Sequence, residues 1–108
     1  RWQHLPKLTQ TLKVIGGSVT AIDFRGIECE NLRYLWISDL PQLEHVELSG
    51  LEKCTKLETL GIGSNAKLTR VSIAPLERCR KLRWLYLCKN ALEDLDLSPL
   101  RRSSSLKE

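Results

Sequence analysis

The leucines of this chain recur with a period of 25 residues, and this period limits its possible folds more than any other feature. The pattern Leu-x-x-Leu-x-Ile/Leu occurs at residues 32–37, 57–62 and 82–87. Alternating apolar residues in so short a run indicate a strand with one buried face. A single unit cannot bury its own leucines, so the units must stack into one continuous core.

Weaker copies and further ladders extend this pattern along the chain. A degenerate first copy contains Thr9, Leu12 and Val14, and Leu106 begins a last one. A second apolar ladder consists of Val19/Ile22/Phe24, Leu43/Val46/Leu48, Leu68/Val71/Ile73 and Leu92/Leu95/Leu97. A third consists of Ile27, Leu51, Leu76 and Leu100. We expect all of these side chains to lie inside the stack.

The period also predicts the division of the chain. One domain covers residues 1–108, with repeats at 9–31, 32–56, 57–81 and 82–105 and a truncated repeat from 106. Residues 1–8 form either a cap or the end of a lost repeat. Because the sequence stops one turn into a repeat, we expect the natural protein to continue beyond it. Proline at Pro75 and Pro99 indicates two helix starts, since proline is favoured at the first helical position.

These repeats resemble the leucine-rich repeat superfamily, and the resemblance covers essentially the whole chain. Residues 82–92 fit the consensus LxxLxLxxNxL, including Asn90, and residues 57–68 fit it with Asn65 and one extra residue. Residues 95–100, with the sequence LDLSPL, resemble the DLSPL-type repeats of microbial members.

The resemblance implies an α/β fold. The expected architecture is a right-handed solenoid with a curved parallel sheet on the concave side and short helices and extended segments on the convex side. It also implies a ladder of asparagines hydrogen-bonded to the loop backbone. Leu40 and Gly17 stand where this asparagine belongs in the second and first repeats. We therefore expect an irregular turn in the N-terminal half.

A candidate ligand surface follows from the residues that point away from the core. The third, fifth and seventh positions of each strand face outward. On the second and fourth strands these positions hold Tyr34, Trp36, Trp84 and Tyr86, and the strand between them offers only Thr59, Gly61 and Gly63. Strands spaced ~4.8 Å apart place the aromatic pairs roughly 10 Å apart. The sequence thus predicts a slot with aromatic walls and a bare floor.

Exposed tryptophan and tyrosine are enriched in binding hot spots, so we interpret this slot as a docking surface. The basic residues Lys13, Arg33, Arg83 and Lys89 border it and favour an acidic or aromatic-bearing partner. The predicted function is a scaffold module that binds a protein or peptide. Two plainer explanations are cross-strand stacking of surface aromatics and glycines that only loosen a strand. A different function is that of a structural spacer in a larger multidomain protein.

Other function classes find less support in the sequence. Nucleic acid could meet the basic helix residues Lys53, Lys56, Arg78, Arg80, Lys81, Arg101, Arg102 and Lys107. This partner is disfavoured because Glu52 and Glu77 interrupt them and the net charge is only +4. We expect no enzyme and no cofactor, since no paired-carboxylate, phosphate-loop or Ser/His/Asp pattern occurs. No apolar run approaches the length of a membrane span.

The cysteines favour free thiols. An even count permits a disulfide framework, but Cys29, Cys54 and Cys79 recur 25 residues apart, which we interpret as one small buried position in each repeat. Zinc would need ligand spacing that His4 and His45 do not supply. Cys88, in an outward position, is the thiol expected to react. Free thiols favour a reducing, intracellular and cytoplasmic setting.

Two surfaces complete the predictions. Asp23, Glu47 and Asp96 form a column broken by Ser72, interpreted as a solvated acidic stripe and not as a metal site. At the C-terminal side we expect an open edge through which the protein self-associates. The leucines expected at that edge are Leu85, Leu87, Leu95 and Leu97.

Overall fold

The computed structural model describes residues 9–93 and 95–100. Four short strands come first along this part of the chain, and short 3₁₀ helices alternate with strands from the fourth strand onward. The strands are β1 (Thr11–Ile15), β2 (Ala21–Asp23), β3 (Tyr34–Ser38), β4 (His45–Glu47), β5 (Thr59–Gly63) and β6 (Trp84–Tyr86). The helices are η2 (Leu51–Lys53), η3 (Ala74–Arg78) and η4 (Ser98–Leu100). The α/β class is confirmed at this level, as parallel strands with a few short helices. Pro75 and Pro99 lie at the helix starts that the sequence predicted.

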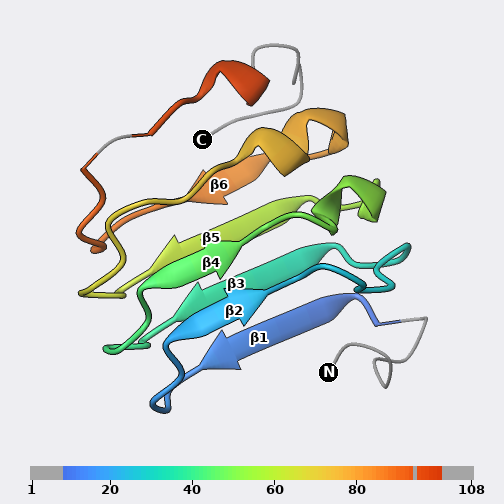
Figure 1. Ribbon diagram of the computed structural model, residues 1–108. Coiled ribbons are helices and arrows are strands. Elements are labelled where there is room, and N and C mark those ends of the chain that lie inside the picture. The colour runs from blue at the N-terminus through green and yellow to red at the C-terminus, as the bar shows by residue number, and fades with distance from the viewer. Residues whose placement is uncertain (1–8, 94, 101–108) are drawn as a thin grey trace.

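The strands form two parallel sheets on opposite sides of the molecule. One sheet has the order β1-β3-β5-β6 and the other contains β2 and β4. Figure 1 shows β2 and β4 in front of the larger sheet, with the short helices following them toward the C-terminus. Within the larger sheet, Leu35 pairs with Leu60, and Leu60 pairs with Leu85. Among β3, β5 and β6 the 25-residue period of the sequence is therefore the register of the sheet, whereas β1 pairs with β3 at an offset of 23 residues, Thr11 with Tyr34.

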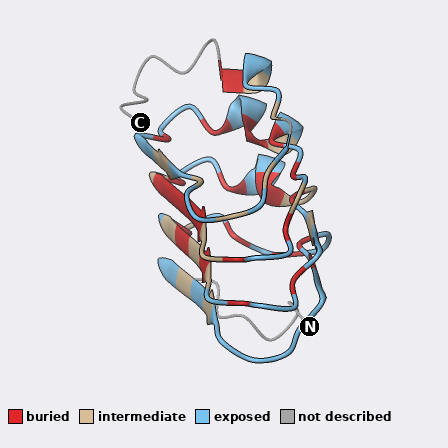
Figure 2. Ribbon diagram, turned by 90° about the vertical axis from the view of Figure 1, so that its left-hand side faces the viewer, coloured by how far each residue is buried: buried red, intermediate tan, exposed pale blue. Residues whose placement is uncertain are grey.

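The core lies between these two layers. The buried parts of the strands and helices face one another across the interior (Figure 2). Ile27, Leu51, Leu76 and Leu100 are all buried, as the third ladder predicted. Val19 corrects the second ladder, because 43% of its surface is exposed, whereas Leu97, 54% exposed, agrees with the exposure expected for it at the C-terminal side. Leu85, Leu87 and Leu95, expected to be exposed with Leu97, are half-buried against the core. Val19 and Leu97 stand apart from the buried members of their ladder. These two residues belong to the first and last described repeats, which have a neighbouring repeat on one side only.

Two asparagines tie the turns that follow the strands. The buried Asn65 side chain accepts a hydrogen bond from Leu40 N (3.1 Å) and donates to Ile37 O (3.4 Å). Asn90 Oδ1 accepts from Asn65 N (3.2 Å), and Asn90 Nδ2 donates to Ile62 O (2.7 Å). Each amide therefore satisfies backbone groups of the preceding turn that would otherwise be buried without partners.

One residue in each of the turns after β3, β5 and β6 adopts a left-handed conformation. This holds for Asp39, Ser64 and Lys89, with φ between 57° and 60°. The expectation of an irregular turn at Leu40 is wrong, because that turn keeps the left-handed residue and the bond to Asn65. In the first repeat, the successive glycines Gly16 and Gly17 both have positive φ, so the departure is confined to that repeat.

The acidic column has a structural role that the sequence interpretation missed. Asp23, Glu47 and Asp96 each accept a hydrogen bond from the backbone N–H two residues later, and Ser72, which interrupts the column, accepts one in the same way. The Arg25 guanidinium also donates to both oxygens of Asp23, and it holds the pKa of that carboxyl at about 2. The column therefore fixes the turns after the second ladder and is more than a solvated stripe.

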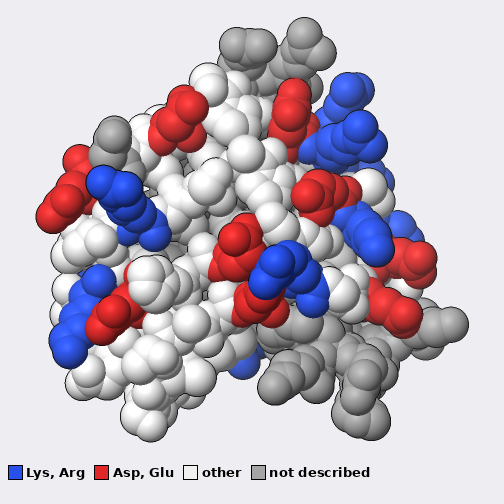
Figure 3. Space-filling view, in the orientation of Figure 1, with Lys and Arg blue, Asp and Glu red and all other residues white. Residues whose placement is uncertain are grey.

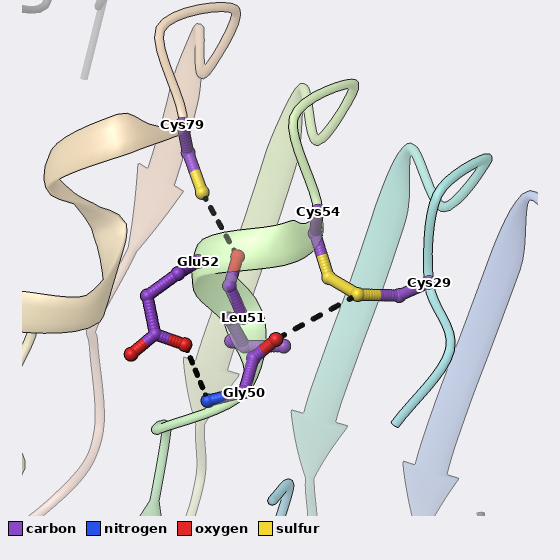
Figure 4. The surroundings of a disulfide bond; sticks show 6 residues. All are labelled: Cys29, Gly50, Leu51, Glu52, Cys54 and Cys79. Atoms are coloured by element: carbon purple, nitrogen blue, oxygen red, sulfur yellow. Dashed lines mark hydrogen bonds between the residues drawn. A yellow bond between two sulfur atoms is a disulfide. The ribbon is translucent and has the colours of Figure 1, made fainter. Parts of the chain in front are cut away.

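The cysteines overturn the expectation of free thiols. Cys29 and Cys54 form a disulfide that joins two neighbouring repeats, with Cα atoms 5.1 Å apart (Figure 4). Stacking places equivalent residues at adjacent-strand spacing, which lies within the range that a disulfide needs. Cys79, one repeat further, is a buried free thiol, and Cys88 is an exposed one. The reducing setting was inferred from free thiols. Because Cys29 and Cys54 are bonded to each other, they no longer support that inference.

The thiol of Cys79 is held in place by the backbone of the preceding repeat. Its Sγ donates a hydrogen bond to Leu51 O at 3.4 Å. Burial, with a smaller contribution from the charge of Glu52, raises the pKa of this thiol to about 12. It is therefore a protonated, unreactive group at neutral pH.

Several predictions lie outside the residues that the structure describes. They are the cap or repeat end at 1–8, the end of the fourth repeat at 101–105, the truncated repeat from 106, His4, and the basic residues Arg101, Arg102 and Lys107. Over residues 9–93 and 95–100, the helices are too short and too polar to cross a bilayer.

Candidate functional site

The aromatic residues that the sequence placed outward share one face of the larger sheet. Tyr34 and Trp84 both lie in register with Thr59, and Trp36 and Tyr86 both lie in register with Gly61. The alternate residues of β3 and β5 are buried in the core. The predicted common face is therefore confirmed. We call Tyr34, Trp36, Trp84 and Tyr86 the aromatic cluster.

Three rings of the cluster are in contact, so the prediction of two separated walls is wrong. The ring centroids of Trp36 and Tyr86 are 5.6 Å apart, with an angle of 24° between the planes. Those of Trp84 and Tyr86 are 6.4 Å apart, and the planes differ by 8°. The rings form one stack that reaches from β3 across β5 to β6.

Gly61 is the reason why this stack can form. A Cβ atom added at position 61 would overlap the Trp36 ring at Cε3 and Cζ3. The missing side chain thus leaves room for the Trp36 indole to lie over β5 and reach Tyr86. Gly61 is buried in consequence, and Thr59, between Tyr34 and Trp84 in the register, is buried as well, with 6% exposure. The predicted floor of the slot is therefore covered at Thr59 and Gly61, which cannot be a contact surface in this conformation, whereas Gly63 is half-buried.

The accessible part of the cluster lies at the β6 side of the sheet. Trp84 and Tyr86 expose 37% and 41% of their surfaces, whereas Tyr34 and Trp36 are half-buried. A partner would therefore meet the edges of the Trp84 and Tyr86 rings first. Stacked rings with polar tips offer a rigid apolar ridge whose side-chain entropy is already low.

Basic side chains border this ridge, but one of them is engaged. Lys13, Arg83 and Lys89 are exposed. Arg33 Nε lies 3.6 Å from Glu58 Oε2, so its charge is partly offset. The sequence analysis overlooked Glu58, although Arg33, Glu58 and Arg83 follow one another at the 25-residue period. That alignment was the signal for an ion pair between repeats.

Shallow depressions lie on the opposite layer, away from the aromatic cluster. One is lined by Glu47, Glu52, Glu77 and Arg78 beside η2 and η3. Another lies between residues 44–47 and residues 69–72. In the part of the chain that the structure describes, no group of His, Cys, Asp and Glu side chains is arranged to hold a metal ion.

The predicted basic surface for nucleic acid is mixed in charge. Figure 3 shows the β2–β4 layer, where acidic side chains lie among the lysines and arginines. Glu52 and Glu77 stand on η2 and η3, beside Lys53 and Arg78. An alternation of this kind weakens attraction to a phosphate backbone.

Comparison with known proteins does not assign the chain to a family. No protein-family model matches the chain. No curated protein sequence matches it either.

Proposed function

We propose that the chain is a leucine-rich repeat solenoid that binds a protein or peptide segment, without catalysis, on the outer face of its larger sheet. The observation that carries the proposal is the stack of Trp36, Tyr86 and Trp84 in outward positions, with the last two rings exposed. Large rigid aromatics at the surface are the residues on which binding energy concentrates.

The repeat assignment is supported by three features of the described residues. The register among β3, β5 and β6 follows the 25-residue period, Asn65 and Asn90 bond to the preceding turns, and the turns after these three strands each contain a left-handed residue. Features that recur at one interval favour a chain built from stacked equivalent units.

The expected partner is an extended segment with acidic residues beside an apolar or aromatic anchor. Lys13, Arg83 and Lys89 would attract its charges, and the Trp84 and Tyr86 edges would contact its anchor. Rim charges of this kind speed association and select partners, while the buried anchor supplies most of the affinity.

A peptide-display selection on the purified domain tests this function. Random extended peptides are selected on the wild-type protein, and the best binders are synthesised and titrated against Trp84→Ala and Tyr86→Ala. We expect acidic sequences with an aromatic or large aliphatic residue. Each alanine variant should lose at least about 30-fold in affinity, as truncation of a hot-spot residue does.

Two controls make the result specific. Arg25→Ala changes an exposed side chain on the opposite layer and should leave peptide affinity unchanged. Circular dichroism and thermal unfolding should show that the two aromatic variants keep the wild-type fold. Peptides that bind both aromatic variants as tightly as the wild type would place the binding surface elsewhere.

A spacer role is the second candidate, and one observation favours it. The Trp36 ring already packs over Gly61 and against Tyr86, so the stack stabilises the sheet whether or not a partner binds. Under this function Trp36→Ala would lower stability by about 0.5–1.5 kcal/mol beyond the loss of its buried area. Trp84→Ala and Tyr86→Ala would then leave every selected interaction intact.

A further inference from the structure

Backbone hydrogen bonds join neighbouring repeats on the β2–β4 layer. Where the first repeat meets the second, the N–H groups of Glu44 and His45 donate to Thr20 O at 2.8 and 3.2 Å. Where the third repeat meets the fourth, Glu93 N donates to Thr69 O at 3.0 Å. The same kind of bond therefore recurs at the first and the third joint.

The joint between the second and third repeats lacks these bonds. Over residues 9–93 and 95–100, no backbone hydrogen bond joins residues 44–47 to residues 69–72. The parallel ladder of this layer is thus interrupted inside the stack, with a bonded joint on each side of the interruption.

The interruption leaves the outer edge of β4 open. His45 N donates to Thr20 O and Glu47 O accepts from Phe24 N, so both β4 residues turn these groups toward β2. The backbone groups of successive strand residues point to opposite sides, so the N–H and C=O of Val46 face residues 69–72. Within the described residues neither group is bonded to another residue. An unpaired edge of this kind is a template for an added strand.

Two depressions lie along this edge and form one groove, which we call the joint groove. The first, of about 300 Å³, lies between residues 44–47 and residues 69–72. The second, of about 340 Å³, continues it beside η2 and η3, and the two share Glu47 and Ser72 in their walls. The joint groove therefore follows the open edge of β4 and runs on to the two short helices.

The side chains that line the joint groove favour a basic occupant. Four carboxylates border it against two guanidinium groups; they are Glu44, Glu47, Glu52 and Glu77, and Arg70 and Arg78. Glu47 Oε2 accepts from the Ser49 hydroxyl at 2.7 Å, and Glu52 Oε1 accepts from Gly50 N at 2.7 Å (Figure 4). These bonds fix the two carboxylates and use one oxygen of each, which leaves the other for a cation.

We propose that the joint groove binds an extended, basic peptide segment of a partner protein as an added strand of the β2–β4 sheet. The backbone of the segment pairs with the N–H and C=O of Val46, and its lysine or arginine side chains meet the carboxylates along the groove. In this mode of recognition the main-chain bonds supply affinity and the side chains at alternate positions supply selectivity. The joint groove lies on the layer opposite the aromatic cluster, so the proposal goes beyond the function proposed above and does not depend on it.

Hydrogen exchange in the free protein tests the open edge first. The amide of Val46 should exchange at least about tenfold faster than that of His45, which is bonded to Thr20 O. Both residues lie in β4, so the comparison is made within one strand. Equal protection of the two amides would mean that the joint is closed, and would overturn the proposal.

Peptide titration tests the occupant. The probe is a short peptide that alternates lysine and valine and has blocked termini. One comparison peptide has glutamate in place of lysine, and the other has the probe sequence with a methyl group on every backbone nitrogen. Calorimetry should show binding of the probe, and the probe should slow exchange of the Val46 amide. Each comparison peptide should bind at least about tenfold more weakly, because one loses the opposite charge and the other the main-chain donors.

Charge reversal in the protein locates the binding surface. Glu44→Lys/Glu77→Lys changes two exposed residues that line the joint groove. Glu28→Lys/Glu30→Lys makes the same change in charge at exposed positions outside it and is the matched control. The groove variant should bind the probe at least about tenfold more weakly than the wild type, and the control within about twofold of it. Thermal unfolding should show that both variants keep the wild-type fold.

Three results of these titrations would each overturn the proposal. The first is a probe that fails to bind the wild-type protein up to millimolar concentration. The second is a groove variant that binds the probe as tightly as the control does. The third is a methylated peptide as tight as the probe, which would mean that charge alone holds the peptide and that no strand is added.

Discussion

Reduction of the Cys29–Cys54 disulfide should lower the stability of this protein by a large and calculable amount. The bond closes a loop of 25 residues between neighbouring repeats. For a loop of that length the chain-entropy relation gives about 3.5 kcal/mol of stabilisation at room temperature, through the restriction of the unfolded chain. For a domain of this size that corresponds to a fall of roughly 15–25 °C in Tm.

Urea unfolding with and without reductant measures this effect. The midpoint should fall on reduction, and the slope m should rise, because the unfolded chain without the cross-link exposes more surface. The double variant Cys29→Ala/Cys54→Ala should respond to reductant in neither quantity. Cys79→Ala serves as the control within the same ladder: it removes a buried thiol and should keep the wild-type response to reductant.

Thiol titration provides an independent check on the same bond. The folded protein should react rapidly at Cys88 alone, because the pKa of the buried Cys79 thiol is raised to about 12. Unfolding should add Cys79, and reduction should then release Cys29 and Cys54. Four titratable thiols in the unreduced, unfolded protein, or a urea midpoint unaffected by reductant, would refute the reasoning.

Three further changes test separate parts of the structure. Gly61→Ala should expel the Trp36 ring from β5, shift tryptophan fluorescence to longer wavelength and cost about 0.5–1.5 kcal/mol of ring stacking, whereas an unchanged spectrum would contradict the contact. Asn65→Ala should cost about 2–4 kcal/mol in urea unfolding, since buried backbone groups lose their partner; a midpoint equal to that of the wild type would rule this out. Because Arg25 holds the pKa of Asp23 near 2, below its value of 3.8 when unfolded, the stabilisation is complete above pH 4 and is lost as pH falls toward 2. In Asp23→Asn, the free energy of unfolding should fall less between about pH 4 and about pH 2 than in the wild type. An equal fall in both proteins would count against the Asp23–Arg25 ion pair.

The residue period carried most of the information about the fold, and the reason is geometric. Strand residues alternate between two faces, and equivalent residues of stacked repeats lie side by side. Two rules of this kind suffice to place Leu35, Leu60 and Leu85 in one ladder and Trp36 and Tyr86 on one face. These rules predict the position of each residue in its strand and the face of the sheet from which its side chain projects.

The contacts of the aromatic cluster lay beyond these rules. Gly61 looked like the floor of a slot because it has no side chain. The same absence allows the long Trp36 side chain to lie across the strand and fill that space. Which of the two happens depends on rotamers and packing energy, and neither can be read from a spacing.

For the disulfide, the sequence analysis placed the cysteines correctly but drew the wrong conclusion from their positions. The sequence argument put Cys29, Cys54 and Cys79 at one position of successive repeats, and the structure agrees. Equivalent positions in adjacent repeats lie at the spacing of adjacent strands, which is compatible with a disulfide. The regular period was therefore evidence that neighbouring cysteines can bond, and the conclusion that they stay free did not follow from it.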